Sequence, residues 1–349
     1  MSSLLEIRSF EIQAASEADY AALNQHSNLL RKERMPDDPP IPLEETIKEL
    51  NNIPSYVDLK RWCVWDTFLN QVLAEGSVQL LKIEENKHLA QFDITVQPTL
   101  RRQGWGRKLL GLITGYAQAQ DRRLLVAQTY DCILGGEAFM KRLGAQKGME
   151  GHINQLRIAD LDRQLLEDWL QRGQSLASEF ELGIWEGPYP EQQLPAIAQL
   201  FELTNQQPFG ELEIEDMHMT SDQIRQMDKL IFSRGSQRWT FYIVEKSTGK
   251  FVGYTETVWN PNRPELLNQD MTGVFPEYRK KGLGRWLKAA MLDKVVKERP
   301  QVKFVRTNNA DVNAAMLKIN NELGFYPYMA GTFWQVDISK VLAYLSQDM

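Results

Sequence analysis

The sequence predicts an α/β (α+β) fold of two tandem domains, each a mixed, mostly antiparallel sheet flanked by helices. Three observations lead to this prediction. The chain has 349 residues, about twice the length of a common single domain. Its 43% hydrophobic and 25% charged residues are typical of a globular protein that buries a core. The third observation is that the two halves of the chain repeat one another.

The repeat is clearest between ITVQPTLRRQGWGRKLLGLI (94–113) and MTGVFPEYRKKGLGRWLKAAM (271–291). In both segments an extended stretch ends at a proline, and an arginine-rich turn with two glycines follows. Further matches occur in the same order, at offsets of 178 to 180 residues: LLVAQT with FVRT, KRLGA with NELGF, and GHINQLRI with GTFWQVDI. Collinear matches of this kind predict a tandem duplication. We expect an N-terminal domain at 1–160, a helical connector at 161–180 and a C-terminal domain at 181–349.

The second half predicts an order of elements. Helical spacing of apolar residues, or enrichment in β-branched and aromatic residues, defines each one. The expected order is helix 190–204, helix 220–232, strand 238–246, strand 250–259, strand 268–275, a helix after the glycines, strand 302–307, helix 312–323 and strand 332–338. Three antiparallel strands followed by helix, strand, helix and strand are typical of a mixed sheet rather than of an alternating βα barrel.

Composition excludes several classes of function. Lys and Arg number 40 against 46 Asp and Glu, and this acidic balance argues against nucleic acid as the main partner. Two cysteines, Cys63 and Cys132, exclude a disulfide framework and indicate a reducing, cytoplasmic setting. Four scattered histidines offer no metal-ligand spacing. The N-terminus lacks a signal-peptide pattern, and no apolar run reaches the ~20 residues of a membrane helix.

The motif that carries chemistry is a strand, then Pro-x-x-Arg-x-x-Gly-x-Gly, then a helix, at 98–106 and 276–284. Glycines let a backbone approach a ligand closely, and free N–H groups at a helix N-terminus attract an anion such as pyrophosphate. A dinucleotide fingerprint does not fit, because its third glycine would fall at Leu109 or Leu287. A phosphate-binding loop with Gly-Lys-Ser/Thr is also absent from both turns.

This turn, together with N-x-x-M-x-x-x-N-x-x-L-G-F at 313–325, resembles the GNAT acetyltransferase superfamily. The resemblance covers nearly the whole chain as two tandem copies, an arrangement similar to that of mycothiol synthase. It implies acetyl-CoA as the donor, with its pyrophosphate on the turn, its pantetheine arm along the preceding strand, and a main-chain N–H near Val274 polarising the thioester carbonyl. The cofactor-binding residues that it implies in the second half are Val274, Phe275, Arg279, Lys280, Lys281, Gly282, Leu283, Gly284 and Asn313. Their first-half counterparts are Val96, Arg101, Arg102, Gln103, Gly104 and Gly106.

The sequence also departs from the family. Many members carry a tyrosine five residues before the Phe of L-G-F, where it protonates the leaving thiolate, but this chain has Asn320. Tyr326 is the candidate replacement, with Tyr328 beside it. In the first half, Ile133 and Met140 occupy the positions of Asn313 and Asn320. We therefore expect the first half to be catalytically silent, although it can retain a CoA site.

The reaction that the resemblance implies is direct attack of a primary amine on the acetyl thioester. A lysine-like amine with a pKa near 10.4 is neutral in only about one of 10^3.4 molecules at pH 7, a deficit of roughly 4–5 kcal/mol. A base is therefore expected. Glu256, on the strand beside the presumed thioester, is the first candidate, and Asp270 is the second. The alternative is that Glu256 is a solvated strand residue.

An acidic loop at 211–216 follows Pro208-Phe209-Gly210. Glu211 and Glu213 could attract a cationic acceptor through their local field, or could simply be solvated charges before a helix.

The leading hypothesis is an acetyl-CoA-dependent N-acetyltransferase that acts on a small-molecule or peptide amine, with the C-terminal half active. A monomer is expected, because the two halves form a pseudo-dimer. A non-catalytic acyl-CoA-binding or sensing protein is the alternative, and an interaction module with vestigial turns is a third.

Overall fold

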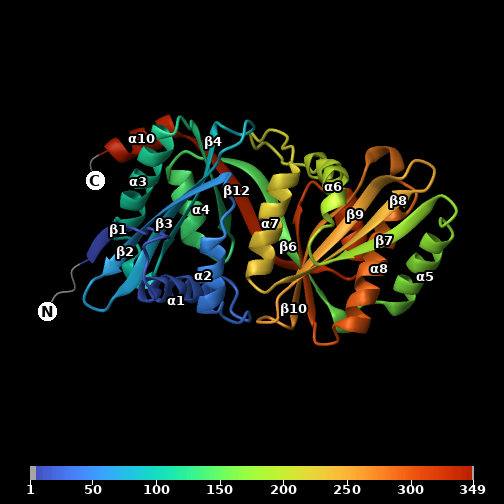
Figure 1. Ribbon diagram of the computed structural model, residues 1–349. Coiled ribbons are helices and arrows are strands. Elements are labelled where there is room, and N and C mark those ends of the chain that lie inside the picture. Colours follow the sequence, from blue (N-terminus) through green and yellow to red (C-terminus); the bar gives the residue numbers. More distant parts are fainter. Residues whose placement is uncertain (1–4, 348–349) are drawn as a thin grey trace. The chain divides into compact units, whose positions relative to one another are not determined.

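The computed structural model describes residues 5–347 and divides into two compact units (Figure 1). Of the described residues, unit 1 contains 5–150, 211–215 and 331–347, and unit 2 contains 151–210 and 216–330. Neither unit is a continuous stretch of chain. This differs from the expected division at residues 160 and 181, because a segment of each half belongs to the other unit.

Unit 1 is a mixed sheet in the order β1-β2-β3-β4-β5-β12, and only β4 and β5 run parallel. Helices α1 and α2 precede β2, and α3 follows β4. The elements, in chain order, are β1 (Leu5–Ser9), α1 (Glu17–Arg34), α2 (Leu43–Asn51), β2 (Val57–Asp66), β3 (Gln71–Leu81), β4 (Leu89–Val96), α3 (Trp105–Ala119), β5 (Leu124–Tyr130), α4 (Leu134–Arg142), the first part of β6 (Gln146–Arg157), the second part of β12 (Tyr326–Asp337) and α10 (Ile338–Ser346).

Unit 2 repeats this plan in the order β6-β11-β10-β9-β8-β7, with β10 and β11 as its parallel pair. The mixed, mostly antiparallel sheet flanked by helices is therefore confirmed. Besides the remaining parts of β6 and β12, the elements are α5 (Arg163–Gln174), β7 (Phe180–Glu186), α6 (Leu194–Phe201), α7 (Ser221–Ser233), β8 (Gln237–Glu245), β9 (Lys250–Trp259), β10 (Leu266–Val274), α8 (Leu283–Glu298), β11 (Phe304–Ala310) and α9 (Ala314–Glu322).

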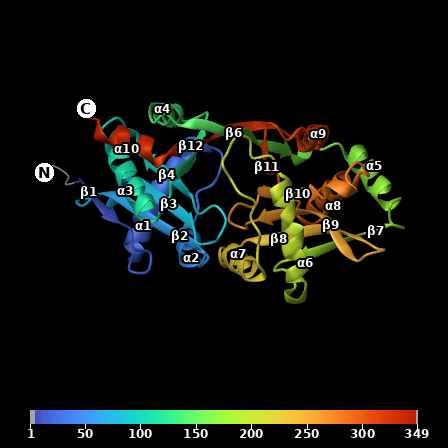
Figure 2. The ribbon, with the colours of Figure 1, turned by 90° about the horizontal axis from the view of Figure 1, so that it is seen from above.

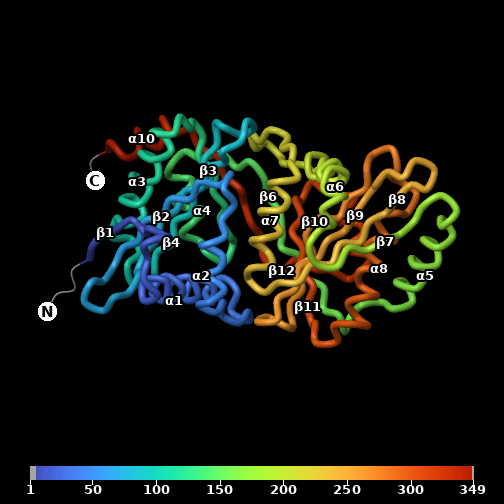
Figure 3. The backbone as a smooth tube through the Cα atoms, viewed as in Figure 1, coloured from blue at the N-terminus to red at the C-terminus, as the bar shows by residue number. Residues whose placement is uncertain are grey.

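The last strand of each half is exchanged between the units. Residues 151–157 of β6 pair with β11, and residues 331–337 of β12 pair with β5. A glycine stands at each crossing: a Cβ on Gly151 would lie 2.4 Å from the backbone oxygen of Asn309, and one on Gly331 would lie 2.8 Å from Nε2 of Gln128. The match of GHINQLRI with GTFWQVDI therefore marks the exchanged segments, and close backbone approach requires glycine at position 151. Figure 3 follows the C-terminal chain, in red, to α10, which packs against α3.

The expected connector at 161–180 is helical, but it is part of the core of unit 2. Helix α5 buries Leu166 and Trp169 in one cluster with Leu292 of α8, and Figure 2 shows the two helices side by side. Gly173 permits this packing, because a Cβ there would lie 2.2 Å from the ring of Trp286. Strand β7 follows α5 and was not among the expected elements.

Two further features position the site. The equivalent strands 124–130 and 304–310 are offset by 180 residues (304 − 124), so Thr129 corresponds to Asn309 and not to Thr307 as the sequence repeat suggested. Strand β10 has a bulge, because the register with β9 shifts between Gln269 and Thr272. Such an extra residue re-aims the side chains beside it. Within residues 5–347, no helix combines the length and apolar character needed to cross a bilayer.

Candidate active site

The turn after β10 has the backbone expected of an anion site. Lys280 and Gly282 both adopt positive φ, at 65° and 89°, and Gly282 is the N-cap of α8. No side chain caps this helix, so the N–H groups of its first turn are left for a ligand. Space beside the turn is open: a Cβ on Gly282 would meet nothing within 4 Å, and one on Gly284 only the Ile319 side chain at 3.6 Å. The turn fits a pyrophosphate.

The basic side chains of this turn have partners within the protein. Nε of Arg279 donates to the backbone oxygen of Val274 at 3.0 Å, which closes the turn back onto the strand. The Lys281 ammonium lies 3.6 Å from Glu179 and 5.1 Å from the centroid of the Phe180 ring. Backbone N–H groups and the exposed Lys280 are therefore the strongest candidates for phosphate contacts.

Unit 1 contains a copy of this turn. Arg102 and Gly104 adopt φ of 63° and 83°, Gly104 is the N-cap of α3, and again no side chain caps the helix. Nε of Arg101 donates to the backbone oxygen of Val96 at 3.0 Å, as in unit 2. Here the Arg101 guanidinium also forms an ion pair with Glu33 through both of its terminal nitrogens. Gln103 donates to the backbone oxygen of Thr99, and the N-terminal turn thus keeps its shape although its downstream motif is lost.

The expected pantetheine contacts lie beside the turn. Val274 is buried against Leu283 at the end of β10, and the backbone N–H of Phe275 donates to the oxygen of Val252. Asn313 is the N-cap of α9: its Oδ1 accepts from the N–H of Met316 at 3.3 Å, and its Nδ2 donates to Gln207 at 2.9 Å. Its cap role explains why an asparagine suits this position.

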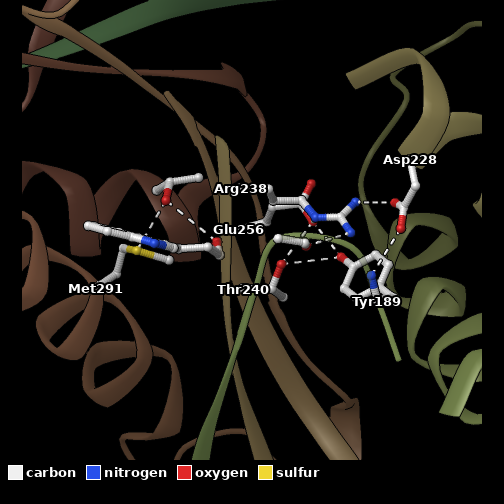
Figure 4. A network of polar contacts seen from close by, with 9 residues as sticks. Tyr189, Asp228, Arg238, Thr240, Glu256 and Met291 are labelled. Carbon is white, nitrogen blue, oxygen red and sulfur yellow. Dashed lines mark hydrogen bonds and ion pairs between the residues drawn. The ribbon is translucent and has the colours of Figure 1, made fainter. Parts of the chain in front are cut away.

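Glu256 lies in a dense polar network in unit 2 (Figure 4). Its Oε2 accepts hydrogen bonds from the hydroxyls of Tyr189 and Thr240, the latter at 3.1 Å. Nε of Arg238 is 3.6 Å from the same oxygen. Because these groups stabilise a fixed carboxylate, Glu256 is not the solvated strand residue of the alternative reading.

Arg238 organises this network from the core. It is 2% exposed, forms a 2.6 Å ion pair with Asp228 of α7, and stacks on the ring of Tyr189 at 3.6 Å. The backbone N–H of Tyr189 donates to the other oxygen of Asp228. One buried guanidinium therefore balances two carboxylates and fixes their positions. Sequence reasoning missed Tyr189, Asp228 and Arg238, because they come from three separate segments without a shared motif.

Asp270 lies at the β10 bulge, where Asp270 and Met271 face the single residue Glu256 of β9. Its side chain is open to solvent, while the surrounding protein and the charge of Glu256 raise the pKa of its carboxyl to about 7. Arg234 and Arg238 act in the opposite direction. An accessible carboxyl with a pKa near neutrality is suited to accept a proton from a substrate.

Asn320, at the position where many family members have a tyrosine, contacts a buried lysine. Nζ of Lys288, on α8, donates to Oδ1 of Asn320 at 2.6 Å and to Oε1 of Gln269 at 2.9 Å. Asn320 in turn donates to Asn309 at 2.7 Å. Lys288 is 1% exposed, and burial lowers its pKa to about 7. No sequence signal identified it, because Lys288 interrupts the otherwise apolar face of its helix.

Tyr326, the candidate general acid, begins β12. Its hydroxyl accepts a hydrogen bond from Nε2 of Gln155 at 2.8 Å, and Gln155 accepts from Arg306. Strand alternation places Arg306 and Asn309 on opposite faces of β11. Tyr326 is therefore tied to the face opposite the Asn309–Asn320 pair, so the two positions are not interchangeable.

The acidic loop is not beside Glu256. Residues 211–215 belong to unit 1, where Glu213 pairs with Arg123 and its backbone N–H donates to Gln335. The backbone oxygen of Glu211 accepts from Gln335, and its N–H donates to Gly148. These contacts give the loop a structural role. Among residues 5–347, no group of three or more His, Cys, Asp or Glu side chains has an arrangement that could hold a metal ion.

Comparisons with known proteins show a match to one family. Residues 197–325 match the model of the Acetyltransferase (GNAT) family. None of the curated proteins matches the chain. The family uses acyl-CoA and acts on amines of small molecules or peptides.

Several solved structures are similar over almost the whole chain. A tandem GNAT protein from the clavulanic acid biosynthesis pathway is 23% identical with a TM-score of 0.75, over 96% of this chain and 99% of that one. A GCN5-related N-acetyltransferase from Sphaerobacter thermophilus is 13% identical with a TM-score of 0.64, over 96% of both chains. The glucosamine N-acetyltransferase region of a fungal β-N-acetylglucosaminidase is 12% identical with a TM-score of 0.65, over 96% of this chain and 38% of that one. The chain therefore has the tandem GNAT fold, and its residues 197–325 match the GNAT acetyltransferase family.

Proposed function

We propose that unit 2 transfers an acetyl group from acetyl-CoA to a primary amine by direct attack in a ternary complex. The observation that carries this proposal is the pair of carboxylates at the β10 bulge, where Asp270 lies four residues before the end of the strand that leads into the open turn at 280–284. Acetyl-CoA supplies the activated acyl group. The chain holds the donor through backbone N–H groups at 280–284 and removes a proton from the acceptor.

Asp270 takes the role of base in this proposal, and Glu256 is a positioning residue. Tyr189, Thr240 and Arg238 hold the Glu256 carboxylate in place, so its charge acts steadily on Asp270. An amine bound near Asp270 passes its proton to that carboxylate, and its nitrogen is then free to attack. With a pKa of about 7, Asp270 is about half ionised at neutral pH.

This assignment reverses the order expected from the sequence, in which Glu256 came first. A dedicated acid to protonate the leaving group is not required, because the thiolate of a thiol with a pKa near 8.5 leaves readily at neutral pH. Tyr326 therefore has no necessary role in the proposal.

The test measures CoA release from acetyl-CoA with a panel of primary amines, using the wild type, Asp270→Asn, Glu256→Gln and Gly284→Glu. Asp270→Asn is expected to lower kcat at least 100-fold and to remove the rise of activity with pH through about 7. Gly284→Glu places a negative charge where the pyrophosphate binds and abolishes transfer in unit 2. Unchanged kcat in Asp270→Asn would refute the assignment of the base.

The alternative, an acyl-CoA-binding or sensing protein, is favoured by Asn320, which is buried and held by Lys288 and Asn309. Titration calorimetry separates the two functions. Acetyl-CoA binding that Gly284→Glu removes, without CoA release from any amine in the panel, would favour sensing over catalysis.

A further inference from the structure

Unit 1 has a polar cluster that no motif of the sequence indicated. It lies on the face of the sheet that α1 covers, since His26 of α1 contacts Oγ1 of Thr95 in β4 at 2.9 Å. Arg61 of β2 and Glu75 of β3 form an ion pair there, and both side chains are largely buried. Asp93 of β4 lies on the same face, because β-register pairs Glu75 with Thr95 and Thr95 is two residues from Asp93.

The cluster repeats the arrangement of unit 2. Asp93 lies three residues before Val96, and Asp270 lies four residues before Val274, the bulge of β10 supplying the extra residue. In each unit a carboxylate of the neighbouring strand stands beside this aspartate, Glu75 here and Glu256 there. Asp93, like Asp270, is partly accessible to solvent, and desolvation by the surrounding protein, together with the charge of Glu75, raises the pKa of its carboxyl.

Arg34 distinguishes unit 1. It is the last residue of α1, two turns beyond His26, and its guanidinium lies 4.6 Å from the centroid of the Tyr130 ring at the end of β5. Its Nε is buried without a hydrogen bond, and within residues 5–347 no carboxylate is within ion-pair distance of it. The nearby Arg31, by contrast, pairs with Asp38 at 2.7 Å. A partly buried guanidinium on an aromatic ring, with no carboxylate within ion-pair distance among residues 5–347, is suited to bind a carboxylate from outside.

The charged groups of this cluster affect one another's pKa values. The charges of Arg34 and Arg61 lower the pKa of Asp93, while that of Glu75 raises it, and Asp93 in turn raises the pKa of Tyr130. Arg34, which lies over the Tyr130 ring, and Asp93 are therefore near enough for their charges to act on one another. The groups that face Asp93 come from α1, β2, β3 and β5.

We propose that unit 1 contains a second acceptor site, for an amine that also carries a carboxylate, in which Arg34 binds the carboxylate and Asp93 receives the proton of the ammonium. The proposal rests on the acyl-transfer function proposed above, and the donor is an acyl-CoA thioester at the turn 98–106. In the transfer the amine loses its proton to Asp93, and its nitrogen forms a bond to the acyl carbon. The carbon–sulfur bond breaks with its electron pair on sulfur, and the departing thiolate takes the second proton of the attacking nitrogen, so that the products are the amide and the CoA thiol.

This site changes what is expected of the first half. The loss of Asn313 and Asn320 counterparts predicted a silent domain, but those residues act in unit 2 as a helix cap and a lysine partner. Neither role is needed by the groups gathered around Asp93. The intact turn at 98–106 supplies the donor site that a second reaction needs.

The first experiment measures binding without chemistry. L-Alanine, ethylamine and propionate are titrated calorimetrically into the full chain with CoA present. L-Alanine is expected to bind, and Arg34→Gln is expected to weaken its binding at least 10-fold. Lys32→Gln, which removes an exposed positive charge two residues away, is the matched control and should leave the affinity unchanged. No alanine binding, or equal binding by Arg34→Gln, would overturn the proposal.

The second experiment separates the units by CoA release. Gly106→Glu and Gly284→Glu block one turn each, and both have room, since a Cβ would meet only a side chain at 3.9 Å or 3.6 Å. We expect Gly284→Glu to retain acetylation of L-alanine and Gly106→Glu to lose it. In the Gly284→Glu background, Asp93→Asn should lower kcat at least 100-fold, and Arg34→Gln should raise KM for L-alanine but not for ethylamine.

The outcomes distinguish the two proposals. Alanine acetylation that Gly284→Glu removes and Gly106→Glu retains would overturn the second site while leaving unit 2 active. No transfer in any variant or in the wild type, with any amine, would overturn both.

Discussion

Burial of the Lys288 ammonium should make the free energy of unfolding depend on pH, and replacing Lys288 with an uncharged residue should remove this dependence. Its pKa is lowered from 10.5 to about 7 because burial disfavours the charged form. Below pH 7 the folded protein carries the whole cost of holding this charge in the core. That cost disappears as the pH rises from 7 to 10.5, so Lys288 makes the fold more stable at alkaline pH.

The magnitude follows from the two pKa values. A difference of about 3.5 units corresponds to roughly 5 kcal/mol at 1.36 kcal/mol per unit. Between pH 7 and pH 10 the gain is roughly 3–4 kcal/mol, because at pH 7 the folded lysine is already half neutral. Lys288→Met removes the charge but leaves Oε1 of Gln269 and Oδ1 of Asn320 without a donor, at about 1–3 kcal/mol each.

Lys288→Met should therefore be close to the wild type in stability at pH 7 and clearly less stable at pH 10. Urea denaturation at both pH values measures this, and the quantity to compare is the change of the mutational free energy with pH. Lys297→Met, an exposed lysine on the same helix, is the control and should show almost no pH dependence. A change below about 1 kcal/mol for Lys288→Met would refute the reasoning.

Four further predictions concern the site and the crossings. Asp270→Asn should raise the free energy of unfolding at pH 8 by about 1–2 kcal/mol in urea denaturation. The raised pKa of Asp270 stabilises the fold while this carboxyl is protonated, and that stability is lost as the pH rises from about 4 through 7, whereas asparagine stays neutral. Partial solvent exposure of Asp270 keeps the gain this small. Tyr189→Phe should lower stability by about 1–2 kcal/mol at neutral pH and shift the pH profile of transfer, because Glu256 loses a donor; an unmoved profile would contradict the link to Asp270. Gly151→Ala should destabilise the chain by more than about 2 kcal/mol in thermal unfolding, whereas Gly115→Ala, with open space around it, should stabilise it by about 0.5–1 kcal/mol. Glu213→Gln should leave KM for a cationic amine and its salt dependence unchanged, because Glu213 already pairs with Arg123; a rise in KM would restore the loop as an acceptor site.

The positions of the carboxylates show where prediction from sequence stopped. Glu256 and Asp270 were both predicted as candidate bases from their place on strands beside the turn, since strand alternation and sequence adjacency are local properties. Their order as candidates could not be found. It depends on the bulge that brings Asp270 opposite Glu256, and on hydrogen-bond and ion-pair partners from β8, from α7 and from the segment between β7 and α6, which have no sequence signature.

In unit 1 the alignment of the two halves found one feature and missed another. Aligning the halves identified the turn at 98–106 correctly, because positive φ at Arg102 and Gly104 requires only local sequence. The alignment did not match Asp93 with Asp270, since the bulge in β10 shifts the register by one residue. A comparison by motif alone therefore marked as decayed a unit that retains its own charged cluster.

The sequence by itself determined the duplication, the type and order of most elements, and the two glycine-containing turns at the starts of α3 and α8, because hydrophobic period, proline and glycine act on the residues next to them. Only the tertiary structure decided that the last strands are exchanged, that α5 belongs to a core, that residues 211–215 serve unit 1, and that Lys288 holds Asn320. Each of these depends on which distant segments pair, and pairing is settled by the free energy of burying surfaces and satisfying hydrogen bonds across the whole fold.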